Sequence, residues 1–488
     1  MPIGLQRWIR TDRVNKPFAG SFDGGGRTIS GMIVDQRKDT AERYSGGLFG
    51  VIRNTGAAEC GVRNLTIADG KIYFYNADSE KNMGNGMLAG VAGDHVSSVV
   101  DFEGITISGG SIQSFGDEKE RIAGGMLGNV AHVRVSDCSV KNIRISGATN
   151  SGGFAGCDQG STYSNCTAAG ELSGHWSLGG FVGYTSYFND DNNKDVESVF
   201  EYCLADVDIT ADDWSAGGFM GWADYAHVFN CVAKGDVTST RSDGDPRAGA
   251  FVGAMKGCTI EKSHAAGRVT EAAPYYAAGG FMGYFDGIGS KFKDCSFDST
   301  LNNDIKAIGG SVKISEPQDY DGITGVPTKQ VKAIICRDYY GTHNLKEVTG
   351  TDATCTEDGV ETYWICDACG IMYSDKDGTT TITEPVVIKA TGHDLVKKDG
   401  KAASSTEDGY KEYWECSTCK KLFSDAKGQN EISNPEVIKA TGEPADKHEN
   451  GKSASTGDSS MPVLYVILAA AALAGAAAVV VTRKKREN

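Results

Sequence analysis

The sequence repeats one short pattern, an apolar pair bracketed by glycines, at intervals of 27 to 40 residues. When the copies are aligned on the closing glycine, both positions before it are apolar in every copy. The closing glycines are Gly50, Gly90, Gly128, Gly156, Gly183, Gly221, Gly253 and Gly283. The position two residues earlier holds Leu48, Leu88, Met126, Phe154, Phe181, Phe219, Phe251 and Phe281. A repeat of this length is the signature of a solenoid or another stacked array.

Between the glycine motifs the chain alternates apolar and polar residues, as in HVRVSDCSVKNIRISG at 132–147. Such alternation is typical of short β-strands. A unit of about 30 residues cannot bury its own apolar face, whereas stacked copies bury it against one another. We therefore expect an all-β parallel β-helix, with rungs about 4.8 Å apart and each column forming a ladder. We expect the motif glycines to lie at sharp turns that require a positive φ.

A third column follows the closing glycine by ten residues in five copies, by twelve at Cys295, and by twenty at Cys203, where the ten residues NDDNNKDVES are inserted. It holds Cys60, Cys138, Cys166, Cys203, Cys231, Ser263 and Cys295. Two interpretations remain open for these cysteines. A buried free thiol behaves as a small hydrophobic group. Alternatively, neighbouring rungs are close enough for a disulfide, for example between Cys138 and Cys166.

Charge and carboxylate placement argue against two classes of function. The chain has 64 acidic and 48 basic residues and a formal net charge of −16, which disfavours nucleic acid as a partner. Glycoside hydrolysis needs two carboxylates across a cleft. The array has adjacent aspartates only in NDDNN at 189–193 and ADDW at 211–214, and the chain has no HExxH motif. We predict that the protein is not an enzyme, with no catalytic residue.

Aromatic residues follow the closing glycine in three of the later repeats, at Tyr184, Trp222 and Tyr284. Aromatic faces repeated along a rod are suited to stacking on sugar rings or on a partner protein. The alternative is that they stack on one another and only stabilise the ladder.

A different repeat, with a period of 50 residues, occupies 341–392 and 393–442. The first copy offers His343, Cys355, Cys366 and Cys369, a complete tetrahedral ligand set for Zn²⁺. The second copy offers His393, Cys416 and Cys419, but Ser405 replaces the equivalent of Cys355. Two alternatives stay open: disulfides between Cys366 and Cys369 or between Cys416 and Cys419, and binding of His393 to the metal of the first copy.

The C-terminal segment predicts attachment to a membrane. A polar linker at 443–460 precedes an apolar segment at 461–482, which is long enough to cross a bilayer as a helix. The basic tail at 483–488 is expected to stay in the cytoplasm, with the rest of the chain outside. The N-terminus lacks the apolar core of a signal peptide, so we expect that the β-helix, assigned to 1–335, is truncated there.

These motifs resemble known families. The glycine-bracketed pair, with the lead-in FAGSFDGGGRTISGM at 18–32, resembles the GLUG repeat of bacterial surface proteins over roughly residues 15–310. That family includes the non-catalytic region of IgA-protease-like proteins. The modules at 341–442 resemble small His/Cys repeats of Firmicutes surface proteins. Thr456 and Gly457 before the apolar segment resemble a sortase signal, although Ser453 and Ala454 replace its Leu-Pro.

The resemblance implies a right-handed β-helix on the surface of a Gram-positive bacterium. The chain would be anchored by its membrane helix or, after cleavage between Thr456 and Gly457, by the cell wall. We expect an adhesin or a structural display protein whose ligand is a glycan or a protein. The alternative is the non-catalytic fragment of a larger surface enzyme, a peptidase or a polysaccharide-degrading enzyme, whose catalytic part is missing.

Overall fold

The structure is a computed structural model that divides into two compact units, residues 1–391 and 392–488. It describes residues 2–9, 12–37, 42–57, 59–75, 83–94, 99–115, 121–189, 195–241, 247–271, 278–286, 289–311, 319–341 and 343–442. No helix among these residues is long and apolar enough to cross a membrane. The predicted span at 461–482 and the linker before it lie outside the described residues.

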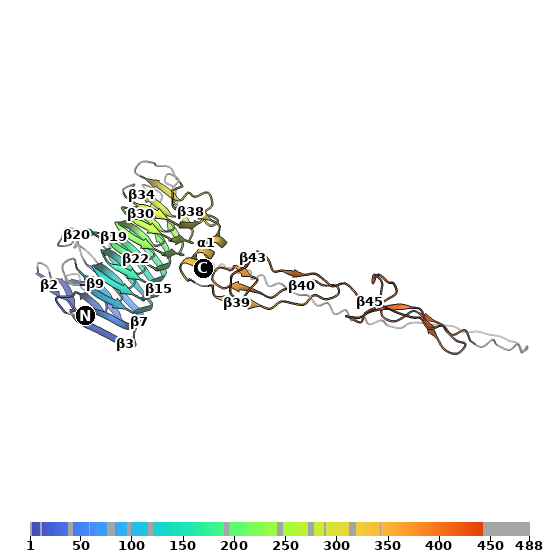
Figure 1. Ribbon diagram of the computed structural model, residues 1–488. Coiled ribbons are helices and arrows are strands. Elements are labelled where there is room, and N and C mark those ends of the chain that lie inside the picture. The colour runs from blue at the N-terminus through green and yellow to red at the C-terminus, as the bar shows by residue number, and fades with distance from the viewer. Residues whose placement is uncertain are drawn as a thin grey trace, which may run out of the picture. The chain divides into compact units, whose positions relative to one another are not determined.

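The glycine motifs form one parallel sheet of nine strands, stacked in the order of the sequence (Figure 1). Each strand pairs in parallel with the equivalent strand of the next rung; for example, Val182 faces Met220, and Met220 faces Val252. The strands are β6 (Phe49–Ile52), β9 (Ala89–Gly93), β13 (Leu127–Ala131), β16 (Ala155–Gln159), β19 (Val182–Ser186), β25 (Met220–Asp224), β30 (Val252–Lys256), β34 (Met282–Phe285) and β37 (Ile308–Ser311).

The remaining strands of each rung join a second parallel sheet of 24 strands, which turns around the other sides of the same core. One ladder in it is β10 (Val100–Glu103), β14 (Val133–Ser136), β17 (Thr162–Ser164), β22 (Ser198–Glu201), β26 (Ala226–Phe229), β31 (Thr259–Glu261) and β35 (Lys291–Lys293). Another begins at β3 (Ser21–Ser30) and β7 (Gly61–Tyr75) and continues through β11 (Thr106–Phe115), β15 (Ser139–Gly152), β18 (Thr167–Gly179), β23 (Leu204–Ala211), β27 (Val232–Ala233), β32 (His264–Ala265), β36 (Cys295–Asp298) and β38 (Ile323–Val326). The predicted parallel β-helix is confirmed by these coil-to-coil pairings.

The phenylalanine column stacks as predicted. Successive rings of Phe154, Phe181, Phe219, Phe251 and Phe281 have centroids 4.7 to 5.1 Å apart and lie within 11° of parallel. All five side chains are fully buried. The centroid separation matches the spacing of paired strands, so ring stacking and backbone pairing share one repeat distance.

We expect Phe219→Ala to lower the free energy of unfolding of the β-helix by about 3–5 kcal/mol, because it removes a buried ring between two others. Urea unfolding followed by circular dichroism measures the change. Tyr187→Ala is the matched control, since the Tyr187 side chain is 38% exposed and its loss should cost much less. Equal losses for the two variants would contradict a buried ladder.

The motif glycines have a different role from the predicted one. None of the described bracket glycines has a positive φ. Instead, their backbone lies against the neighbouring rungs: a Cβ on Gly218 would be 2.1 Å from the Ala250 carbonyl oxygen, and one on Gly217 would be 2.4 Å from the Gly253 nitrogen. Glycine is required here because no side chain fits between the stacked coils.

The positive-φ corner lies instead at the residue before the cysteine column. Asp137, Asn165, Tyr202, Asn230, Lys262 and Asp294 occupy it with φ between 48° and 55°. The next side chain then turns inward and donates to the carbonyl two residues back, with Cys166 Sγ 3.2 Å from Ser164 O and Ser263 Oγ 2.9 Å from Glu261 O. A buried side chain that is small and carries one donor suits this place, which explains why serine replaces cysteine once. The column is buried, and its cysteines are free thiols rather than neighbour-to-neighbour disulfides.

A ninth rung follows the eight that the motif predicts. Ile308 of β37 pairs with Met282, and the Phe281 amide donates to the carbonyl of Ala307 at 3.0 Å. Alanine stands here in the phenylalanine column, and the paired glycines follow instead of preceding it, so the sequence pattern failed to reveal this rung.

The only helix of the described chain, α1 (Thr328–Asp338), packs along the side of the last rungs. Val331 and Ile335 are buried against Leu204 and Val232 of neighbouring coils. The Asn230 side-chain amide donates to the Asp338 carbonyl oxygen at 2.5 Å, and Lys234 Nζ to the Tyr340 hydroxyl at 2.7 Å. The helix is thereby fixed to the β-helix by both apolar and polar contacts.

His264 is buried beneath α1. Its Nδ1 lies 2.9 Å from Ser296 Oγ, and its Nε2 lies 3.6 Å from an Asp338 carboxylate oxygen. Burial lowers the pKa of His264 from 6.5 to about 4, against the opposing attraction of Asp338. Lys262, Asp294 and Arg337 line the same hollow. The folded protein therefore keeps this imidazole neutral.

The depressed pKa predicts acid sensitivity. The unfolded chain takes up a proton at His264 below pH 6.5 whereas the folded chain does so only near pH 4, so stability is lost as pH falls through that window. Between pH 7 and pH 5 the loss is about 2 kcal/mol, and His264→Gln should abolish it. Urea unfolding at both pH values, with chelator present, tests this. His227→Gln, at a histidine whose side chain is 55% exposed, should leave the acid sensitivity unchanged. A loss of the same size in His264→Gln would contradict the assignment.

The two modules that follow have the same strand order. In the first, β39 (Leu345–Val348), β41 (Tyr363–Cys366), β42 (Met372–Tyr373) and β43 (Thr381–Ile382) form an antiparallel sheet, and β40 (Gly359–Val360) pairs with β44 (Val387–Ile388). In the second unit, β45 (Leu395–Lys398), β47 (Tyr413–Cys416), β48 (Leu422–Phe423) and β49 (Glu431–Ile432) repeat the sheet, and β46 (Gly409–Tyr410) pairs with β50 (Val437–Ile438). Leu345 pairs with Cys366 in the first module, and Leu395 pairs with Cys416 in the second. The two copies of the 50-residue repeat therefore have the same strand register.

Candidate metal centre

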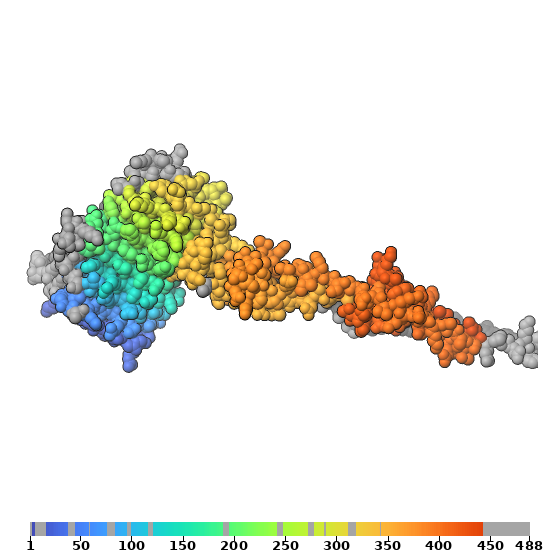
Figure 2. All heavy atoms as spheres, in the orientation of Figure 1, coloured from blue at the N-terminus to red at the C-terminus, as the bar shows by residue number. Residues whose placement is uncertain are grey.

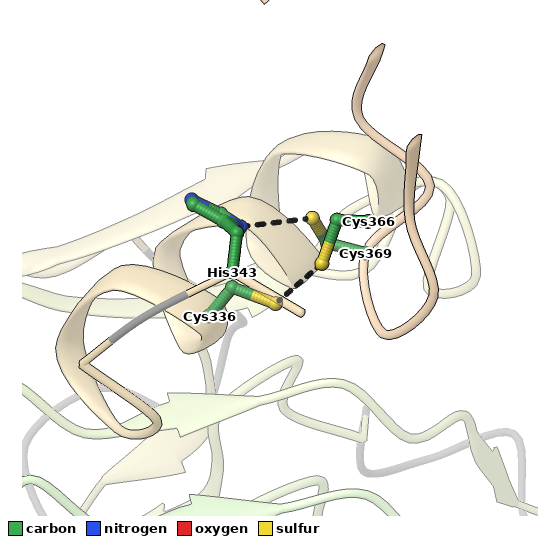
Figure 3. Close-up of side chains that lie close together, drawn as sticks. All are labelled: Cys336, His343, Cys366 and Cys369. Atoms are coloured by element: carbon green, nitrogen blue, oxygen red, sulfur yellow. Dashed lines mark hydrogen bonds between the residues drawn. The ribbon is translucent and has the colours of Figure 1, made fainter. Parts of the chain in front are cut away.

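Four potential metal ligands converge where α1 meets the first module. Cys336, His343, Cys366 and Cys369 each offer a ligand atom, and these atoms all lie within 4.8 Å of one another (Figure 3). Cys336 Sγ lies 3.8 Å from Cys366 Sγ, and Cys369 Sγ lies 3.6 Å from His343 Nδ1. Three of the four residues are those predicted from the sequence.

Cys355, the fourth ligand expected from the sequence, is not among these four residues. Cys336, in the last turn of α1, occupies that place. Cys355 lies instead next to Thr354, within the turn that the Thr354 amide closes with the Glu357 carbonyl. The sequence comparison matched Cys355 to Ser405 within the repeat, but the fourth ligand comes from a helix that precedes the repeat.

The local fold explains why Cys366 and Cys369 face the same point. Cys366 ends β41, and a tight turn leads to β42, with the Gly370 amide donating to the Cys366 carbonyl at 2.8 Å. Gly370 has φ +68°, a value that glycine adopts readily. His343 lies just before β39, whose Leu345 pairs with Cys366, and this pairing places the imidazole opposite the turn.

Cys336 reaches the cluster because of its position on α1. Its neighbour Ile335 is buried against the β-helix, whereas Cys336 is buried with Cys366, Cys369 and Tyr373. Successive residues of an α-helix are about 100° apart around its axis, so adjacent residues can face two different bodies. The signal in the sequence was a cysteine seven residues before His343 in an amphipathic segment.

The separations fit a tetrahedral metal site. Zinc binds sulfur at about 2.3 Å and nitrogen at about 2.0–2.1 Å. In an ideal tetrahedron with these bonds, two sulfur ligands lie about 3.8 Å apart, and a sulfur and a nitrogen ligand lie about 3.5–3.6 Å apart. The two measured distances, 3.8 and 3.6 Å, agree with these values. A disulfide requires sulfurs about 2.05 Å apart, and Cys366 and Cys369 are free thiols here.

The electrostatics differ among the thiols. Burial raises the pKa of Cys336 and of Cys369. Burial also acts to raise the pKa of Cys366, but the backbone N–H of Cys369 and the His343 ring outweigh it and lower the pKa. Cys366 is thus the thiol that the surrounding dipoles favour as a thiolate, which is the form that binds a metal.

The second unit brings together its three predicted residues. His393 Nδ1 lies 3.4 Å from Cys419 Sγ. The Cys416 pKa is lowered by the Cys419 backbone N–H and by His393, against the effect of burial. The turn resembles that of the first module, although Lys420, with φ 64°, stands where the first module has Gly370. These three residues also could contribute to a metal site.

The predicted ligand-binding aromatics lie on the nine-stranded sheet. Tyr184 pairs with Trp222, Ala254 interrupts the column, and Tyr284 follows. The Arg247 guanidinium carbon lies 4.0 Å from the ring centroid of Tyr284 and 5.2 Å from that of Trp222. Trp222 and Tyr284 therefore contact a cation of the chain itself, and the binding role of the three aromatic residues stays a prediction. Thr456 and Gly457 lie outside the described residues.

Ser296, His264 and Asp338 contact one another in that order where the end of α1 meets the β-helix. They have the residue types of a hydrolytic triad, and no motif in the sequence indicates this arrangement. Ser296 is only 3% exposed and His264 only 1%. A nucleophile must reach the substrate, and this hydroxyl is enclosed by the β-helix. We assign the three residues to the docking of α1.

No family model matches the chain, and no curated protein matches it. Among solved structures it is similar to full-length QnrB1, described as a plasmid-mediated fluoroquinolone resistance protein. The sequences are 10% identical, the match covers 66% of this chain and 99% of that one, and the TM-score is 0.20.

Proposed function

We propose that the protein is a non-enzymatic, surface-anchored β-helix of a Gram-positive bacterium that displays a ligand-binding face. The observation that carries this proposal is the continuously filled core. Side chains of one rung pack on those of the next from Phe49 to Ile308, and the colour passes in sequence order from blue to yellow along the β-helix (Figure 2). Such a rod suits a rigid support for surface residues.

The charged surface supports a structural role for the array. Exposed side chains pair between neighbouring rungs, as Arg134 does with Asp101 at 2.7 Å and Arg144 with Glu171 at 3.0 Å. The two carboxylates of ADDW have different partners: an Asp212 oxygen lies 2.5 Å from His175 Nδ1, and Asp213 forms an ion pair with Arg241. Two carboxylates engaged separately do not form an acid and base pair around one bond.

The finer assignments belong to this proposal. The β-helix would be right-handed and of the GLUG type, as the motif's resemblance implies. The segment at 461–482 would cross the membrane, or Thr456–Gly457 would be cut by a sortase. For the display face we favour the predicted aromatic residues Tyr184, Trp222 and Tyr284, together with the neighbouring Trp214, which is 37% exposed. Flat aromatic rings of this kind suit a glycan or a protein ligand.

The alternative is that the chain is the non-catalytic part of a larger surface enzyme, either a peptidase or a polysaccharide-degrading enzyme. The GLUG resemblance favours it, because that repeat also occurs beside catalytic domains. Sequencing of the genomic DNA upstream of Met1 separates the two: a signal peptide alone supports the first proposal, and a catalytic domain supports the second.

Attachment is tested by fractionating Gram-positive cells that express the chain behind a functional signal peptide. We expect the protein in the envelope, and release to the medium when 463–482 is deleted, because that segment is the proposed anchor. Thr456→Ala separates the two anchors: a shift from wall to membrane fraction indicates sortase, and no shift indicates a membrane helix. Intact protein in the cytosol would contradict both.

We expect the purified chain to release no product from pectin, peptidoglycan or peptides, measured by reducing-end assay and mass spectrometry. The physical reason is that Asp212 and Asp213 contact different partners, His175 and Arg241, and do not face one bond together. Hydrolysis that disappears in Asp213→Asn or Asp190→Asn, while Asp101→Asn retains it, would overturn the non-enzymatic assignment.

A further inference from the structure

We propose that one Zn²⁺, held by Cys336, His343, Cys366 and Cys369, joins the β-helix to the first module. The metal would thus be a cross-link between two parts of the chain and not an internal staple of the repeat. This inference does not depend on how the protein is anchored or what its surface binds.

The first step is the ligand set. Three thiols and one imidazole are typical of a closed structural zinc site, in which no position is left for substrate. Three of the four residues are buried, and the remaining one, His343, is partly buried. The separations of 3.8 and 3.6 Å agree with the edges of a tetrahedron around zinc. Binding converts thiols to thiolates, and the protons leave to solvent.

The second step is the origin of the ligands. Cys336 belongs to α1, whose Val331 and Ile335 are buried against the β-helix. The other three ligands belong to the first module (Figure 3). A metal that binds all four residues therefore connects the end of the solenoid to the module through eight residues of chain, from Cys336 to His343.

The third step is the small core of the module. Between residues 343 and 391 the buried hydrophobic side chains are those of Cys355, Cys366, Cys369 and Tyr373. Three of these four are cysteines, and two of them are proposed ligands. A domain with so little apolar core usually depends on a metal or on disulfides for stability. Loss of zinc should therefore loosen the module and its attachment together.

The test uses the full chain with Cys416→Ser and Cys419→Ser, which removes the thiols of the second unit. Elemental analysis after dialysis should give about one zinc per chain. Adding Cys336→Ser should reduce the retained zinc at least tenfold, whereas adding Cys355→Ser should leave it unchanged. Replacement of zinc by Co²⁺ gives a second readout, because thiolate-to-cobalt absorption should fall in the Cys336 variant and not in the Cys355 variant.

Hydrogen exchange distinguishes a cross-link from a site within the module. Chelator should increase amide hydrogen exchange in the last turn of α1 as well as in β41 and β42. Exchange in the nine-stranded sheet of the β-helix should stay slow. Retention of zinc by the Cys336→Ser variant, or its loss in the Cys355→Ser variant, would overturn the assignment. The absence of bound zinc in the parent chain, or iron in its place, would overturn it as well. Increased exchange in β41 and β42 with α1 unaffected would leave a metal site but refute the cross-link.

Discussion

The close approach of backbone to backbone at the glycine motif is the constraint on which the β-helix depends. A Cβ on Gly218 would meet the Ala250 carbonyl, and one on Gly221 would lie 2.6 Å from that of Gly183. Because these strands touch without side chains between them, the apolar pair of each motif is held in register with the next. The stack of Phe181, Phe219 and Phe251 follows from that register, since rings at the same position must lie one strand spacing apart.

Much of this fold could be predicted from the sequence because the repeat is local and frequent. Columns of apolar residues at a fixed offset from a glycine leave few arrangements other than stacked coils. The reason for the glycines could not be deduced, since both a positive φ and a close contact select the same residue. The rung at Ile308 was missed because Ala307 fills the phenylalanine position with a side chain too small to mark the pattern.

Three of the four residues in the metal cluster could be predicted because they lie within the repeat, whereas Cys336 could not. Cys366 and Cys369 are close in sequence, and a tight turn brings them together wherever the module lies. The fourth ligand is set by packing, and packing places Cys336 there because Ile335 beside it is buried on the other side of the helix. A comparison of two repeats detects only residues that recur, and the sequence of α1, TKQVKAIICRD, has no counterpart in the residues before the second copy. The burial that makes Ser296 and His264 inaccessible was likewise invisible in the sequence.

The equivalence of the rungs has a consequence for how such a protein can change over evolutionary time. Phe181 donates its amide to Phe219 at 2.8 Å, and Phe219 and Phe251 do the same to the next residue in the column, also at 2.8 Å. Unequal recombination that deletes or duplicates one whole coil would place chemically identical partners at the new junction. Gene copies of different length would then encode rods of different reach that share the same two ends, so selection could adjust the extension of the protein without redesigning its core.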